Sequence, residues 1–271
     1  MVFNPKNLRV KALGNIFPER IRELDEVFFS KPTAVYIDWS NVIHWQEKIN
    51  WHISLERIKL LLDSFDQIQA VHLYCGTLEG NELSERQVKD VVEWGYNLVT
   101  KPVKRMSLSI DISSIPSDST AIIKNFVKKS LLSKLDIETV SFLNSKLKQL
   151  NQTGERSLEE LKCNFDVEMG RDMLRDFLSG KYENFVIWSG DSDFQSPIKQ
   201  LTEDEKSVSV FSMSGSVAPE IDEAGVLIFD IRKIKEFICW PRELGDSIKD
   251  RIAVQLEQIK AKGTPEEAPQ L

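Results

Sequence analysis

The chain has few of the residues that build disulfide frameworks or zinc sites. It contains three cysteines and three histidines in 271 residues. Cys75, Cys163 and Cys239 are scattered, odd in number and without CxxC spacing, which argues against both kinds of site. We therefore expect a protein of the reducing cytoplasm.

Long apolar runs are also missing. No stretch of about 18 apolar residues occurs, which is the length needed for a transmembrane helix. Residues 1–10 lack the apolar core of a signal peptide, so we expect neither secretion nor membrane insertion. With 41% hydrophobic residues, the chain has enough apolar side chains for a large buried core.

Positive charge is in deficit over the chain as a whole. The net charge of -7 argues against a surface that binds nucleic acid over a broad basic area. The exception lies between Lys101 and Lys134, where seven basic residues stand against two acidic ones. Such a stretch is either a solvated helical face or a local track for a polyanion. Its candidate contact residues are Lys101, Lys104, Arg105, Lys124, Lys128 and Lys129.

Short apolar segments alternate with amphipathic helical patterns along much of the chain. Ala34 to Asp38 is typical of a buried strand, and Ser54 is a suitable N-cap for the helical pattern that follows it. This alternation predicts an α/β fold with a central, mainly parallel sheet. Further strands are predicted at 70–75, 96–101, 185–189, 208–211 and 226–229, and further helices at 81–94, 165–178 and 194–201.

Three segments depart from this alternation. Residues 1–32 form an N-terminal extension that ends at Pro32. Within a main domain at 33–240, the pattern loosens from about 102 to 160, and its helix-like part predicts a helical insertion. Residues 241–271 predict a polar amphipathic helix followed by a disordered tail.

Acidic side chains stand where predicted strands end. Asp38 closes the first strand, Asp191 and Asp193 follow a later one, and Asp166 opens the helix between them. In α/β sheets, ligands bind outside the carboxyl ends of the strands, so these acids are expected to converge on one hard cation. Taken singly, each acid is more often a helix cap or a turn residue.

Together and in this order, the motifs resemble the NYN branch of the PIN-like nucleases, and within it the LabA-like bacterial group. The matching segments are 35–41 with its Asp-x-x-Asn, the Phe-Asp-Val entry at Asp166 with Asp172 behind it, and Ser-Gly-Asp-Ser-Asp-Phe at 189–194. The resemblance covers roughly residues 33–234. It implies a Rossmann-like (PIN-like) three-layer fold with a divalent-metal ribonuclease centre.

The resemblance also implies roles for individual residues. Asp38, Asp166, Asp191 and Asp193 would be the catalytic, metal-holding acids for Mg²⁺ or Mn²⁺. The implied partner is RNA, expected to be single-stranded, with the basic residues named above lining its path to the acids. A second copy of the chain or a protein partner could bind through the insertion. Asn41, Ser189 and Asp172 would act as supporting residues.

Two departures from the family pattern keep a second hypothesis open. Trp39 stands where a small residue is usual and would either alter the turn or add a surface for base stacking. Lys162 only loosely matches the lysine that commonly precedes the middle aspartate. The alternative is a catalytically silent NYN module that binds RNA or protein. A haloacid-dehalogenase-like phosphatase ranks lower, because it needs a second acid where Ser40 stands. Trp45 and Trp51 either stack on bases or pack a long loop against the sheet.

Overall fold

The computed structural model describes residues 3–28, 31–111, 122–125, 127–152, 157–213 and 215–263. The chain divides into two compact units, one made of Met1–Pro102 with Asn164–Leu271 and the other of Val103–Cys163. The predicted tail from residue 264 onward lies outside the described residues. In the described ranges, no helix has the length and apolar character needed to cross a membrane.

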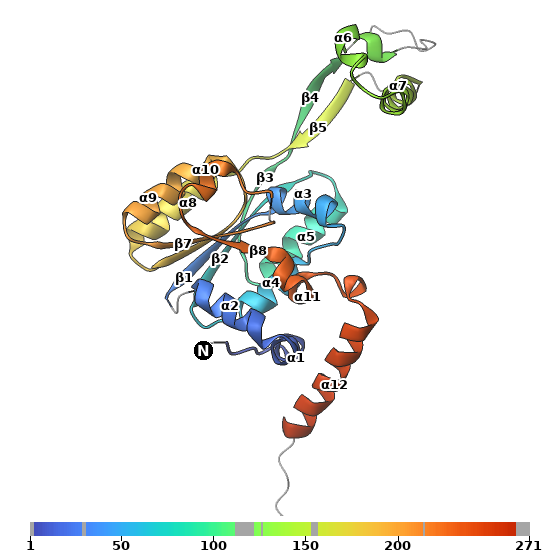
Figure 1. Ribbon diagram of the computed structural model, residues 1–271. Helices are drawn as coiled ribbons and strands as arrows, with labels where there is room; N and C mark the ends of the chain where they lie inside the picture. Colours follow the sequence, from blue (N-terminus) through green and yellow to red (C-terminus); the bar gives the residue numbers. More distant parts are fainter. Residues whose placement is uncertain are drawn as a thin grey trace, which may run out of the picture. The chain divides into compact units, whose positions relative to one another are not determined.

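The first unit is built on a sheet of six parallel strands in the order β3-β2-β1-β6-β7-β8 (Figure 1). The central strand β1 pairs with β2 on one side and β6 on the other, so that Tyr36 lies beside both His72 and Ile187. The strand order reverses between β1 and β6, which is where α/β sheets bind their ligands. The bounds are β1 Thr33–Asp38, β2 Ile68–Thr77, β3 Asn97–Pro102, β6 Asn184–Trp188, β7 Ser207–Ser212 and β8 Leu227–Asp230.

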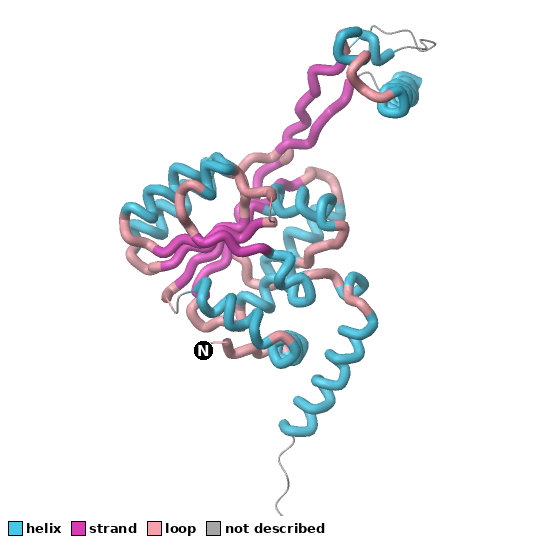
Figure 2. Tube along the Cα trace, in the orientation of Figure 1, coloured by secondary structure: helices cyan, strands magenta, loops and turns pink. Residues whose placement is uncertain are grey.

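Helices cover both faces of this sheet, which confirms the predicted three-layer α/β fold (Figure 2). All six residues of β1 are buried, as expected for a parallel strand covered on both faces. Val35 and Ile37 join the main hydrophobic core, whereas the Tyr36 hydroxyl points to the other side and donates to Asp176 on α8 at 2.7 Å. The helical layer on the side of Val35 and Ile37 contains α1 Leu8–Ile16, α2 Pro18–Phe28, α3 Trp39–Ile49, α4 Leu55–Leu62, α5 Glu82–Glu93 and α11 Lys235–Ile238. The layer on the side of Tyr36 contains α8 Asp166–Ser179, α9 Gln195–Glu203 and α10 Pro219–Asp222.

Local sequence signals account for several helix ends. The side chain of Ser54 accepts a hydrogen bond from the backbone of Arg57 and caps α4, as predicted. Gly180 ends α8 in the left-handed conformation that glycine adopts without strain. The last helix, α12 Asp246–Gly263, packs against α1. Short 3-10 helices occupy η1 Ile122–Asn125, η2 Ser192–Phe194, η3 Ile231–Ile234 and η4 Pro241–Glu243.

The segment after β1 is helical, so the alternative of a long loop there is wrong. The carboxylate of Asp38 caps α3 by accepting a hydrogen bond from the backbone of Asn41. Trp45 lies on this helix and Trp51 follows it, and both are buried in the core. The capping acid and the buried aromatic face together explain why this segment folds as a helix.

The second unit contains an antiparallel strand pair that the sequence did not reveal. Strand β4 Lys104–Asp111 pairs with β5 Ser157–Lys162, with Lys104 opposite Lys162. The helical part consists of η1, α6 Lys129–Leu132 and α7 Ile137–Gln152, so the helix-like pattern is confirmed but is broken before Asp136. Asp136 starts α7 by accepting a hydrogen bond from the backbone of Thr139. Strands so far apart in the chain leave no local hairpin signal.

Candidate metal centre

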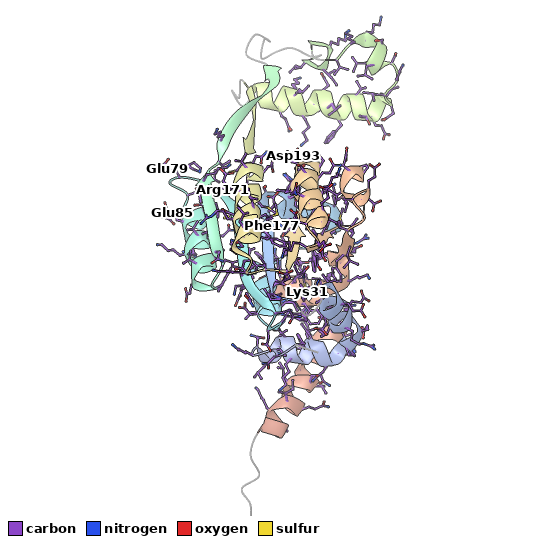
Figure 3. The ribbon with its side chains drawn as sticks, turned by 90° about the vertical axis from the view of Figure 1, so that its left-hand side faces the viewer. Lys31, Glu79, Glu85, Arg171, Phe177 and Asp193 are labelled. Atoms are coloured by element: carbon purple, nitrogen blue, oxygen red, sulfur yellow. The ribbon has the colours of Figure 1, made fainter. Side chains whose placement is uncertain are left out.

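The candidate acids gather where the strand order reverses. Asp38 is the last residue of β1, Asp191 caps η2 just after β6, and Asp166 is the first residue of α8. Figure 3 shows Asp193 at one end of the sheet and Lys31, which precedes β1, at the opposite end. The parallel strand directions therefore bring acids from distant parts of the sequence to one edge.

Three of these acids form what we call the aspartate cluster: Asp166, Asp191 and Asp193. One carboxylate oxygen from each lies within 4.8 Å of the others. Asp193 is exposed, and the other two are half-buried. The backbone N–H of Asp193 also donates to the carboxylate of Asp191 at 3.2 Å, which holds these two acids in one turn.

The electrostatics of the cluster fit a hard cation. Burial raises the pKa of Asp166 to about 6, and this rise is reinforced by a hydrogen bond with Asp193 and by the charges of Asp193 and Asp191. A hydrogen bond with Asn164 acts in the opposite direction. Oxygen donors that repel one another at this spacing are suited to Mg²⁺ or Mn²⁺, which takes oxygen ligands at about 2.0 to 2.1 Å and keeps several waters.

Asp38 lies beside the aspartate cluster but is not one of its three members. It is 5% exposed, and its carboxylate accepts hydrogen bonds from the Ser40 hydroxyl at 2.6 Å and the Asn41 backbone at 3.3 Å. Burial raises the pKa of Asp38, and the charge of Asp191 contributes to this rise, so the two carboxylates are close enough to repel. Asp38 therefore presents a buried, oriented carboxylate next to Asp191.

The turn after β6 is held from two sides. The hydroxyl of Ser189, which is fully buried, accepts a hydrogen bond from the Asp191 backbone at 3.3 Å. The side-chain oxygen of Asn41 lies 3.4 Å from the Gly190 nitrogen, which donates to it. A Cβ on Gly190 would lie only 2.2 Å from the backbone oxygen of Ser216. Only glycine therefore fits at this position without a shift of the neighbouring chain.

Asp172 lies away from the cluster and contributes to the seating of α8. It is 8% exposed, and its carboxylate accepts hydrogen bonds from Tyr74 on β2 at 3.2 Å and from Arg171 at 3.0 Å. The contact between Asp176 and Tyr36 anchors the same helix to β1. These buried contacts fix α8 on the sheet and thereby position Asp166 at its start.

Lys101 and Trp39 differ in what they offer a ligand. The Lys101 ammonium lies 2.9 Å from Glu168 and 4.6 Å from the centre of the Phe165 ring, and both of these residues are close in sequence to Asp166.

Trp39 is only 8% exposed and belongs to the main core. This burial leaves only a small part of the Trp39 ring exposed, and its use as a stacking surface for RNA bases stays a prediction.

Two neighbours of the acids were not recognised as such from the sequence. Asn164 accepts a hydrogen bond from the Asp166 backbone at 2.8 Å and interacts with its carboxylate. Ser40, which stands where a phosphatase would have its second acid, donates its hydroxyl hydrogen bond to Asp38. Asparagine or serine two residues from an aspartate at a helix start is a recognisable Asx- or ST-turn signal.

The basic residues of the insertion belong to the second unit. That unit has ten basic residues against seven acidic ones, whereas the remainder of the chain has 25 basic residues against 35 acidic ones. The side chains of Arg105 and Lys162 lie outside the described residues. The four other predicted contact residues of this unit have exposed side chains: Lys104, Lys124, Lys128 and Lys129.

Comparisons with known proteins found similarity to one family model, to one curated protein and to one solved structure. The sequence profile of the NYN domain matches residues 124–231, which include the aspartate cluster but not Asp38. The chain is 23% identical over 206 residues to the low amplitude and bright protein LabA of Synechococcus elongatus, a match that covers 76% of this chain and 86% of LabA. A crystal structure of a protein of unknown function from Vibrio parahaemolyticus is 12% identical, with a TM-score of 0.44, and covers 77% of this chain and 96% of its own.

Proposed function

We propose that this chain, an NYN-domain protein similar to LabA, is a divalent-metal-dependent ribonuclease. The observation that carries the proposal is the aspartate cluster at the point where the strand order reverses. Three carboxylates from two separate segments are held together there despite their mutual repulsion. A cluster that costs stability without a cation is best explained by a cation that binds to it.

Each acid has a distinct part in this proposal. Asp166, Asp191 and Asp193 would hold Mg²⁺ or Mn²⁺, and Asp38 would supply a further carboxylate near Asp191. When bound, the cation would lower the pKa of a water molecule and offset charge on the phosphate that is cleaved. Ser40 and Asn41 keep Asp38 oriented, and Ser189 keeps the Asp191 turn in place.

The proposed substrate is single-stranded RNA. The larger unit has an excess of acidic residues, so a polyanion approaches it unfavourably unless cations are supplied. A cation held by the aspartate cluster would supply positive charge there, and the exposed lysines of the insertion supply it elsewhere on the chain. We propose that Lys124, Lys128 and Lys129 bind phosphates of the RNA backbone.

The proposal is tested with purified protein and a labelled single-stranded RNA. Cleavage is expected with Mn²⁺ or Mg²⁺ and should stop when EDTA removes the metal. Asp191→Asn should reduce the cleavage rate by on the order of 100-fold or more, the scale seen when one electrostatic stabiliser is lost. The matched control is Asp250→Asn, which removes the charge of an exposed aspartate on α12 and should cleave like the unmodified protein.

The outcomes separate the enzyme from the silent binding module. Equal cleavage by the Asp191→Asn and unmodified proteins would identify a contaminating nuclease. RNA binding without metal-dependent cleavage would favour the module that only binds. In that case the acids would serve as turn and helix caps, a role that Asp38 and Asp191 already fill in their own segments.

A further inference from the structure

A pocket of about 780 Å³ lies in the larger unit, on the helical layer that contains α3, α4 and α5. We call it the arginine pocket. Its apolar wall includes Trp39, Ile43, Leu60 and Trp94. Its volume falls in the range of small-molecule binding sites, about 300 to 1,000 Å³. None of the aspartate cluster lines it, so it is a separate site.

Two guanidinium groups, of Arg9 and Arg57, line this pocket. Arg9 donates to the backbone oxygens of Glu236 and Phe237, and Arg57 donates to that of Cys239. These contacts explain why the arginines are held in place, but they use only part of each guanidinium, which carries five N–H donors. The Nε–H of Arg9 is buried and has no hydrogen-bond acceptor among the residues that the structure describes.

The two guanidinium groups lie close enough to repel each other. Burial lowers the pKa of Arg9 to about 10, and the charge of Arg57 is the next largest cause. Glu56 at the pocket acts in the opposite direction on both arginines. Within the described ranges, neither arginine forms an ion pair with a carboxylate. Two buried cations without a paired carboxylate carry a desolvation cost and repel each other, and a bound anion would offset both costs.

We propose that the arginine pocket binds a nucleoside 5′-monophosphate, with the phosphate at Arg9 and Arg57 and the base against the apolar wall. A phosphate monoester carries a charge of about -1.5 to -2 at neutral pH, which matches two guanidinium groups better than a single carboxylate does. Trp94 is half-buried and Ile43 is exposed, and both offer apolar surface in the pocket against which a planar base can pack. This inference does not depend on ribonuclease activity.

The test is calorimetric titration of the full-length protein with AMP, in EDTA so that the aspartate cluster holds no metal. AMP should bind, and adenosine and inorganic phosphate should each bind at least about tenfold more weakly. Indole-3-acetate, an aromatic carboxylate, is titrated as well to distinguish a carboxylate ligand from a phosphate ligand. Tighter binding of indole-3-acetate than of AMP would overturn the phosphate assignment. Absence of binding by every probe would overturn the pocket.

Variants locate the binding within the protein. Arg57→Gln keeps a donor for the Cys239 oxygen and should weaken AMP binding by about tenfold, the effect of losing one hydrogen bond to a charged group. Arg175→Gln, on the exposed side of α8, is the matched control and should change nothing. Unchanged affinity in Arg57→Gln would contradict the proposal.

A second pair of variants guards against misfolding. Ile43 is 41% exposed, so Ile43→Glu should fold, and its negative charge at the pocket should repel the phosphate. Ile43→Gln is the neutral control and should bind AMP more tightly than Ile43→Glu. Equal affinities in these two variants would place the phosphate somewhere else. Thermal unfolding of each variant checks that the fold is retained.

Discussion

One carboxylate oxygen of Asp166 lies within 4.8 Å of one of Asp193, although Asp166 opens α8 and Asp193 lies in the turn after β6. At this spacing the negative charge of each carboxylate disfavours ionisation of the other, and burial together with this repulsion raises the pKa of Asp166 to about 6. Ionisation of both groups therefore costs free energy, and a divalent cation would relieve that cost by taking the place of the proton.

The metal-free protein should become more stable when Asp166 is replaced by asparagine. The pKa of Asp166 is raised from 3.8 to about 6, so its contribution to the free energy of unfolding is fully present below about pH 4 and is lost as the pH rises through 6. In EDTA at pH 7.5, Asp166→Asn should raise stability by about 1 kcal/mol after allowance for solvent screening.

Thermal unfolding at several pH values measures this effect. The difference between Asp166→Asn and the unmodified protein should shrink as the pH falls from 7.5 to 4, because the unmodified Asp166 then becomes protonated. A stability difference that stayed constant across this range would contradict the assignment of the raised pKa to Asp166.

Mn²⁺ or Mg²⁺ should raise the melting temperature of the unmodified protein. A ligand at 100 times its dissociation constant stabilises the folded state by about 2.7 kcal/mol, which shifts the melting temperature by roughly 5 to 10 °C for a domain of this size. Asp191→Asn should lose most of this shift, whereas Asp250→Asn should keep it. A metal-induced shift that survives in Asp191→Asn would place the metal outside the aspartate cluster.

Two glycine substitutions should have opposite effects on stability. Gly190→Ala places a Cβ 2.2 Å from the Ser216 oxygen and 2.9 Å from the Ser212 hydroxyl, so it should destabilise the protein by about 1 to 3 kcal/mol and displace the Asp191 turn. Gly170→Ala, inside α8 with open space around it, should stabilise by up to about 1 kcal/mol. Denaturant unfolding measures both effects, and a destabilised Gly170→Ala would show that α8 has a close neighbour at that position.

Neutral substitution of the three insertion lysines should reduce the salt dependence of RNA binding. Each phosphate contact with single-stranded nucleic acid contributes about 0.7 to the slope of log affinity against log salt concentration. Replacing Lys124, Lys128 and Lys129 by glutamine should therefore lower that slope by about 2 and weaken binding several-fold at low salt. The melting shift caused by Mn²⁺ should not change.

The control for this triple variant removes the same charge elsewhere. Lys11, Lys199 and Lys249 are exposed lysines of the larger unit and can be replaced by glutamine together. An equal drop in slope for both triple variants would mean that RNA responds to total charge. An unchanged slope in the insertion variant would mean that these lysines form a solvated helical face.

The sequence by itself was sufficient for the α/β architecture and for the six strands of the main parallel sheet. Buried parallel strands such as β1 consist of short apolar runs, and helix ends have local signals such as the N-cap Ser54 and the C-cap Gly180. These signals depend on residues within one or two turns of each other, so they can be recognised without knowledge of the fold. The acids at the strand ends were recognisable for the same reason.

Only the tertiary structure decided which of those acids come together. Asp193 lies with Asp166 and Asp191 in the cluster. The carboxylate of Asp38 instead caps α3 and accepts hydrogen bonds from the Ser40 hydroxyl and the Asn41 backbone. That choice depends on where α8 rests on the sheet, which buried contacts with Tyr74 and Tyr36 determine. The same holds for the β4 and β5 pairing and for the meeting of Arg9 with Arg57, because contacts between distant segments arise from packing and leave no periodic trace in the sequence.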